Sequence, residues 1–231
     1  MPYDIPNLRI EWTNKDYGFP LGFWRSVGPS QNGFIIESFI DELAHAAKKD
    51  PFEYRSALLG KSPRHKGVME AVAQKANWGA PLPAGQFRGI AVVFSYGSYA
   101  ATVAEVSVAA DGTPRVHRLV TGIDAGLAVN PDQIKAQMEG GAVYALTAAY
   151  YGKITLDKGR VEQSNFHDYP MLRIGEMPLV DVLIVDSKEA AGGLGEPGVP
   201  SVAPAVCNAV FALTGKRIRS LPIDKDLLKR A

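Results

Sequence analysis

The chain has 231 residues, of which 46% are hydrophobic and 21% are charged, and its formal net charge is +1. This composition is typical of a globular protein and excludes bulk disorder, and without a basic block the chain lacks the electrostatic footprint of a nucleic-acid-binding protein. The single cysteine, Cys207, excludes an internal disulfide framework and an iron–sulfur cluster held by this chain alone, because such clusters normally need four cysteine ligands.

Metal, membrane and export signals are also missing from the sequence. The histidines are scattered, without a metal-ligand spacing, so no metal site made of protein side chains is expected. No apolar stretch reaches membrane-spanning length, and the first dozen residues have no signal-peptide core. The compartment is left open, since a chain without a signal is cytoplasmic unless an exported partner carries it to the periplasm.

The N-terminal part is predicted to hold a strand and then helices. Leu8, Ile10 and Trp12 alternate, which predicts a strand, and a loop rich in glycine and aromatic residues follows. Apolar residues then recur at helical spacing from about residue 32 to residue 47.

Proline marks the start of two further helices. Asp50-Pro51 predicts a capped helix to about Leu59, and Ser62-Pro63 predicts another that ends near residues 77–79. The Pro/Gly-rich stretch that follows separates two expected segments. Residues 1–80 would hold the N-terminal strand, the loop and the helices, and residues 81–231 would form a mixed β/α segment.

The second segment begins with β-rich runs at residues 90–96, 101–110 and 115–124, the last two joined by the hairpin signal Asp111-Gly112. Asn130-Pro131 predicts the start of a long helix, with Gln133 placed to complete its cap.

The remaining elements are a short hairpin at residues 157–159, a strand at 179–187, a helix that ends at Gly215 and a closing strand at 217–223. Helices come first and a mixed region of strands and helices follows. This order predicts an α+β fold in which helices pack with mixed sheets, rather than a regular βαβ alternation.

Glu196 is the only charged residue between Glu189 and Lys216. A carboxylate in apolar surroundings has its reactivity set by its site, which is how a general base is usually made. The alternative is a partly solvated acid near a helix N-terminus, and composition alone favours that alternative. The glycines around Glu196 also fit the dinucleotide pattern G-x-G-x-x-G. Too little chain follows for a βαβ unit, and the next acid is Asp224, so a nicotinamide or flavin site is rejected.

Four segments, read together, resemble the molybdenum hydroxylase superfamily of xanthine dehydrogenases and aldehyde oxidoreductases. They are "GFWRSVGPSQNGFIIESFIDELA", "VNPDQIKAQMEGG", "RVEQSNFHDYPMLRIGEMP" and "GGLGEPGVPSVAPAVCNAVFALTGKRIRSLPI". The chain is most similar to the C-terminal third of the molybdopterin-binding subunit of isoquinoline 1-oxidoreductase-like enzymes. The resemblance implies that this chain is the C-terminal part of a molybdopterin-binding domain.

The resemblance also implies a reaction. Such enzymes hydroxylate aldehydes or N-heterocycles with water as the oxygen source. Glu196 matches the Gly-Glu-Pro glutamate, the general base beside a molybdenum–pyranopterin cofactor, which is molybdopterin or its cytosine dinucleotide form.

Further site residues follow from the same resemblance. Gln137 matches a glutamine that hydrogen-bonds the pterin, and Gly140 and Gly195 are expected to let the backbone approach the cofactor. Arg25 matches an arginine close to the metal, and a surface ion pair is an equal alternative for it. Phe23 and Trp24 replace an alanine–phenylalanine pair that lines the substrate pocket, which puts the substrate in doubt.

The resemblance implies partners as well. The family's Gly-Gln-Gly and Gly-Gly-Gly-Phe-Gly segments do not occur in this sequence. A second molybdopterin-binding chain, or a missing N-terminal part, is expected to supply them. Iron–sulfur clusters and any flavin are expected only on partner subunits. The alternatives are a non-catalytic fragment or assembly subunit that binds no cofactor by itself, and a small-molecule-binding domain that has lost this chemistry.

Overall fold

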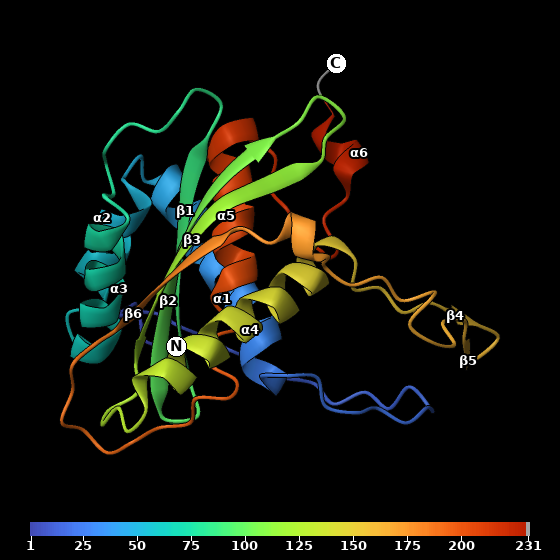
Figure 1. Cartoon of the computed structure of the whole chain (residues 1–231), viewed down its shortest axis with the longest axis horizontal. Helices are drawn as coiled ribbons and strands as arrows, with labels where there is room; N and C mark the ends of the chain where they lie inside the picture. Colours follow the sequence, from blue (N-terminus) through green and yellow to red (C-terminus); the bar gives the residue numbers. More distant parts are fainter. Residues whose placement is uncertain (230–231) are drawn as a thin grey trace.

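The computed structural model describes residues 1–229 and forms a central sheet with helices on both faces (Figure 1). The helices are α1 (Val27–Ala46), α2 (Pro51–Leu58), α3 (Pro63–Lys75), α4 (Pro131–Tyr150), α5 (Val202–Thr214) and α6 (Lys225–Leu228), with a short 3₁₀ turn, η1 (Ile174–Glu176). The strands are β1 (Phe87–Ser95), β2 (Ser98–Val108), β3 (Pro114–Asp124), β4 (Leu156–Asp157), β5 (Arg160–Val161) and β6 (Leu179–Ile184).

The main sheet has the strand order β1-β2-β3-β6. The first three strands pair antiparallel, whereas β6 pairs parallel with β3. The expected α+β class with a mixed sheet is therefore confirmed. The predicted Asp111-Gly112 hairpin joins β2 to β3, and the short predicted hairpin forms the separate pair β4–β5.

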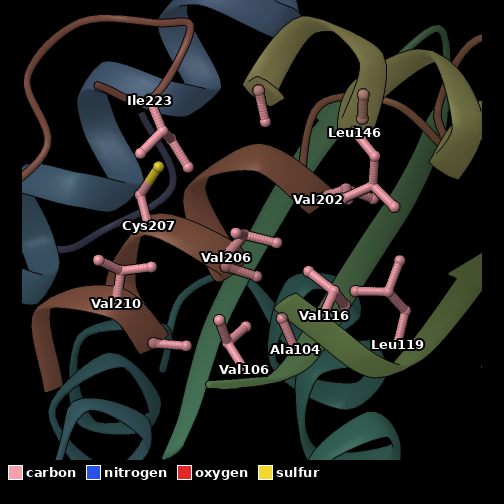
Figure 2. Close-up of a cluster of buried hydrophobic side chains, with 14 of the residues drawn as sticks. Ala104, Val106, Val116, Leu119, Leu146, Val202, Val206, Cys207, Val210 and Ile223 are labelled. Atoms are coloured by element: carbon pink, nitrogen blue, oxygen red, sulfur yellow. The ribbon is translucent and has the colours of Figure 1, made fainter. Parts of the chain in front are cut away.

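The core lies on both faces of this sheet. One cluster joins α3, with parts of α1 and α2, to side chains such as Ile90 and Val103. The other joins α4 and α5 to the opposite face, where Ala104 and Leu119 point (Figure 2). Gly89 lets α5 lie against β1, because a Cβ at this position would be 2.2 Å from the carbonyl oxygen of Ala205.

Helix ends follow the local chemistry of the sequence in most cases. The Asp50 side chain accepts hydrogen bonds from the backbone of Phe52 and Glu53, and the Asn130 side chain accepts one from Gln133. Gly215 ends α5 in the left-handed conformation, as predicted. The serines that precede α1, α3 and α5 (Ser26, Ser62 and Ser201) make no capping hydrogen bond with their side chains.

Two predicted strands are wrong. The structure assigns neither helix nor strand to residues 1–24, although Leu8, Ile10 and Trp12 alternate. Trp12 is 83% exposed, so these residues lack the sheet face that would make alternation useful. Residues 217–223 do not add to the sheet either. Ile218 and Ile223 pack instead into the cluster around α4 and α5.

Helix α1 begins at Val27, several residues before the predicted start near residue 32. Its first turn contains Gly28 and Pro29, which were placed in the preceding loop. Proline is tolerated in a first turn because the N–H groups there have no intrahelical acceptor.

Two apolar arms extend from the body on the same side in Figure 1, one before α1 and one around β4 and β5. We define the arms as residues 7–23 and 153–176. Their exposed large apolar side chains include Leu8, Ile10, Trp12, Tyr17, Leu21, Phe23, Ile154, Leu156, Val161, Phe166 and Ile174. Within residues 1–229, no helix is both long and apolar enough to cross a membrane.

Candidate functional site

The glycine-rich loop before α5 is fixed first at the turn between β1 and β2. Gly193 donates its backbone N–H to the carbonyl of Tyr96 at 2.7 Å, and the Ser98 hydroxyl donates to the carbonyl of Gly193 at 2.6 Å. Tyr96 and Gly97 both have positive φ, 52° and 80°, as a tight two-residue hairpin turn requires. The rigid hairpin thus holds the start of the loop.

Helix α4 then packs directly on the loop. A Cβ at Gly141 would lie 2.8 Å from the carbonyl carbon of Gly198, closer than real contacts allow. A Cβ at Gly198 would lie 3.1 Å from the Cα of Met138. Glycine at both positions therefore brings the α4 backbone against the loop two residues after Glu196.

Glu196 is half-buried and is held by the residue that precedes α1. Its Oε1 accepts a hydrogen bond from the Ser26 backbone N–H at 3.0 Å, and its carbonyl accepts one from the Ser26 hydroxyl at 3.1 Å. Partial burial and the nearby Glu196 carboxylate raise the pKa of the Tyr96 phenol. Glu196 lies before Ser201, the N-cap of α5, so it is not a first-turn acid of that helix.

Arg25 joins the glycine loop to α4. Its Nε donates to the carbonyl of Gly195 at 2.7 Å, and its Nη2 donates to Oε1 of Gln137 at 2.8 Å. The guanidinium also lies over the Tyr144 ring, 5.1 Å from the centroid. Among residues 1–229, no carboxylate is within ion-pair distance of Arg25, so the surface ion pair is not formed.

The structure therefore brings together four of the predicted site residues, Arg25, Gln137, Gly195 and Glu196. Gly140 adjoins them, because a Cβ there would lie 3.7 Å from Nη1 of Arg25. Gln137 is exposed to solvent on the surface of α4. It is also hydrogen-bonded to Arg25.

The two predicted pocket residues, Phe23 and Trp24, lie in different environments. Phe23 is 93% exposed at the end of the first arm. Trp24 is half-buried, packs near Tyr144 and lines a largely apolar cavity of about 470 Å³ between α1, α4 and the start of α5. Glu196 does not line that cavity.

Sequence reasoning assigned no role to four residues of the site. Ser26 and Tyr144 carry no local pattern that would reveal them, since their contacts join distant parts of the chain. The Tyr96-Gly97 pair does carry a signal, because a glycine between two β-rich runs favours a hairpin turn.

Other candidate groups do not form sites. Within residues 1–229, no three histidine, cysteine or acidic side chains gather to hold a metal ion. Cys207 is buried, as expected, and burial raises the pKa of its thiol to about 12, so it is not a reactive thiolate. His167 is exposed in the second arm.

Comparison with known proteins agrees with the family resemblance. Residues 38–178 match the family described as the molybdopterin cofactor-binding domain. Isoquinoline 1-oxidoreductase subunit beta of Brevundimonas diminuta is 35% identical over 225 residues, which are 96% of this chain and 29% of that protein. The membrane-bound aldehyde dehydrogenase (pyrroloquinoline-quinone) of Gluconacetobacter polyoxogenes is 33% identical over 244 residues, covering 96% of this chain and 32% of that protein.

A solved structure has the same fold. The aldehyde oxidoreductase from Desulfovibrio desulfuricans ATCC 27774 superposes with a TM-score of 0.70 at 15% identity, over 89% of this chain and 41% of that chain. This chain thus spans about a third or less of the curated relatives named above. With a family match over residues 38–178, the chain belongs to the molybdopterin cofactor-binding domain family of the molybdenum hydroxylase superfamily.

Proposed function

We propose that this chain forms one wall of the molybdenum-cofactor site of an oxidoreductase that hydroxylates aldehydes or N-heterocycles. Water supplies the oxygen atom, and two electrons and two protons leave for each C–H bond converted to C–OH. Glu196 is the general base. The observation that carries the proposal is the position of the Glu196 carboxylate, held by Ser26 beside the Arg25–Gln137 pair.

The contacts of Glu196 suit a base. The backbone N–H of Ser26 orients the carboxylate through Oε1, and an ionised carboxylate keeps further lone pairs to accept a proton. The carboxylate is half-buried, and the residues that follow it, Pro197 to Pro200, are buried. Reduced access of water strengthens the electrostatic interactions of a carboxylate with a reacting group.

The neighbouring polar groups fit a pterin cofactor. Arg25 uses Nε and Nη2 within the chain, which leaves Nη1 to donate to a ligand, and the Gln137 amide provides two more donors. Gly195 has nothing within 4 Å of the position a Cβ would take, so its backbone is open to close approach. Arg25, Gln137, Gly140 and Gly195 would thus hold the group on one side.

The bound molybdenum group would supply the two-electron acceptor and a Lewis acid. This chain has a single cysteine, which is buried, so the carriers that take the electrons away are not held by the residues of this chain. We therefore place the iron–sulfur clusters and any flavin on partner subunits. The remaining wall of the site belongs to a second molybdopterin-binding chain or to a further N-terminal part of the same protein.

The test is the Glu196→Gln variant of the assembled enzyme, purified from its native source. Glutamine keeps the size and the acceptor for Ser26 but cannot take a proton, so molybdenum content should be unchanged. The rate of reduction by substrate should fall at least to the upper part of the 10²–10⁴ range that is roughly typical of general-base assistance.

Glu189→Gln is the matched control, since Glu189 is an exposed acid at the beginning of the same loop region. It should reduce at the rate of the unmodified enzyme. A Glu196→Gln rate within a fewfold of the control at equal molybdenum content would show that Glu196 is not the base. Metal analysis of the same complex also separates molybdenum from the quinone cofactor named for one relative.

A second candidate is a fragment or assembly subunit that binds no cofactor by itself. It is favoured by the open, exposed Gln137 side of the site. The chain expressed alone should then contain no molybdenum and show no turnover. Stoichiometric molybdenum in the isolated chain would exclude this candidate.

A further inference from the structure

Ser26 connects the start of α1 to the Gly-Glu-Pro loop, although the two lie 170 positions apart in the sequence. It makes two hydrogen bonds to one residue. The backbone N–H fixes the Glu196 carboxylate, and the hydroxyl fixes the Glu196 carbonyl. The same carbonyl also accepts from the backbone N–H of Val199, at 3.1 Å. Carboxylate and peptide are therefore held together from one side.

The backbone at Ser26 is unusual. Ser26 has φ 78°, and Val27 follows with φ 46°, so two successive residues with side chains adopt the left-handed conformation. Glycine is the residue that adopts this conformation without steric cost, and a β-branched residue rarely does so. Strained residues of this kind persist only where the surrounding structure fixes them.

The buried surroundings of Ser26 account for its left-handed backbone conformation. The Ser26 side chain is fully buried, and its hydroxyl has the Glu196 carbonyl as its hydrogen-bond partner. A glycine at position 26 would suit φ better but would lose this hydrogen bond. The serine thus combines an unfavourable backbone conformation with a specific contact to Glu196.

We infer that Ser26 is a positioning residue for Glu196. Its N–H sets the direction of the carboxylate, and its hydroxyl holds the peptide from which that carboxylate extends. We call the two hydrogen bonds from Ser26 to Glu196 the clamp. The clamp is a property of this chain, whereas its effect on catalysis rests on the proposed function.

The test compares Ser26→Gly with Ser26→Ala in the chain expressed alone. Both variants lose the hydroxyl, but glycine relieves the left-handed backbone and alanine does not. If the hydroxyl holds the loop, the backbone amide of Val199 should exchange its hydrogen roughly three- to tenfold faster in both variants. Ser26→Gly should nevertheless unfold at a higher temperature than Ser26→Ala.

Two further variants isolate the two contacts. Ser62→Ala removes a hydrogen bond of the same kind, from a serine hydroxyl to the carbonyl of Pro2 away from the loop, and should leave the Val199 amide unchanged. The Ser26 amide should stay protected in Glu196→Gln, which keeps an acceptor oxygen. It should exchange roughly three- to tenfold faster in Glu196→Ala, which does not.

The assembled enzyme then shows what the clamp does. Ser26→Gly should lower kcat roughly tenfold with KM and molybdenum content unchanged, because positioning of a base affects the reaction more than binding. Unchanged Val199 and Ser26 exchange in these variants would overturn the clamp. Faster exchange with unchanged kcat would confirm the two hydrogen bonds but contradict the positioning role of Ser26, whereas the Glu196→Gln comparison tests separately whether Glu196 is the base.

Discussion

Arg25 is the residue at which three distant parts of the chain meet. It precedes α1, donates to the loop at Gly195 and donates to α4 at Gln137. The aromatic ring of Tyr144 supports its guanidinium from α4 as well. A planar cation with several donors can satisfy all of these contacts, and a lysine could not. Gln137 therefore orients Arg25, in addition to the cofactor contact that we propose for it.

Gln137→Ala should lower the molybdenum content of the assembled enzyme more than the rate per bound molybdenum. The variant removes an acceptor for Arg25 and leaves polar groups of the bound cofactor unpaired, which typically costs about 1–3 kcal/mol. Gln133→Ala is the control, because Gln133 is exposed one turn earlier on α4 and its side chain contacts neither Arg25 nor the loop. Equal molybdenum content in the two variants would assign Gln137 to the solvated surface of the helix only.

His65 gives the chain a pH dependence that does not involve the site. Its ring contacts Tyr99 edge-on at 4.7 Å, and its Nε2 is buried without a hydrogen-bond partner among residues 1–229. Burial, with the N-terminal amino group and Arg64, lowers the pKa of His65 from 6.5 to about 4. The folded protein thus keeps this imidazole neutral at a pH where the unfolded chain protonates it.

The unfolded chain therefore binds more protons than the folded one between pH 6.5 and 4. Stability is fully present above about pH 6.5 and is lost as the pH falls through this window. Because the ring is partly exposed, we expect a loss of only roughly 1–2 kcal/mol between pH 7.5 and 5. Urea unfolding of His65→Phe should show a smaller loss, and the remainder would include His117, whose pKa is also lowered by burial and Arg115. An equal loss in both proteins would contradict this assignment.

At the level of elements, α1 is anchored through buried charges rather than by apolar packing alone. Glu37 accepts hydrogen bonds from the Tyr3 hydroxyl, from Nε of Arg55 on α2 and from the backbone N–H of Val92 on β1. One turn later, Asp41 pairs with Arg217, which follows α5. The position of α1 relative to its neighbours is thus specified, and with it the position of Arg25 and Ser26.

Arg55→Met should destabilise the chain by about 3–5 kcal/mol, because it leaves the Glu37 carboxylate buried without its counter-charge. Arg219→Met is the control. Arg219 pairs with Glu42 but is 71% exposed, and exposed pairs contribute at most about 1 kcal/mol. Urea unfolding at one pH measures both variants. If the two lose the same stability, the buried network does not anchor α1.

Elements with local signals were the ones that could be predicted from the sequence. Asp50-Pro51, Asn130-Pro131 and Gly215 fix helix ends through contacts within a few residues, and Asp111-Gly112 specifies a hairpin by the conformation of its own backbone. The strands predicted at residues 8–12 and 217–223 are not formed. Alternation of apolar and polar residues shows that a segment could have one buried face, but not that a sheet edge is available to pair with it. The predicted start of α1 is wrong because Gly28-Pro29 fits a loop and the first turn of a helix equally well.

Some residues of the candidate site could likewise be predicted from the sequence, and others could not. Glu196, Gln137 and Arg25 were reached through the resemblance of whole segments, which conveys long-range information that composition lacks. The role of Ser26 could not be predicted because both of its contacts to Glu196 cross 170 positions and the helix was predicted to begin only near residue 32. In the structure its side chain makes no capping hydrogen bond and faces Glu196 instead.

For the whole molecule, the two arms are the main departure from a compact body (Figure 1). Among the described residues, the most exposed large apolar side chains include Trp12, Phe23, Phe166 and Ile174. Apolar surface gathered in this way marks contact with another protein surface. This chain spans about a third or less of the curated relatives named above, and we predict that the arms contact the remaining wall of the site proposed above.

The chain expressed alone should therefore bind an apolar dye and self-associate. Replacing Trp12, Phe23, Phe166 and Ile174 together with serine should abolish most of the dye signal. The free energy of unfolding should change by no more than about 0.5 kcal/mol for each site, because these side chains pack against little in the isolated chain. Replacing Leu179 and Leu227 with serine is the control, since both are exposed but lie outside the arms.

In the native source, the fourfold variant should no longer copurify with molybdenum, whereas the control should. Retention of molybdenum by the fourfold variant, or a dye-silent monomer of the unmodified chain, would show that the arms do not form that interface.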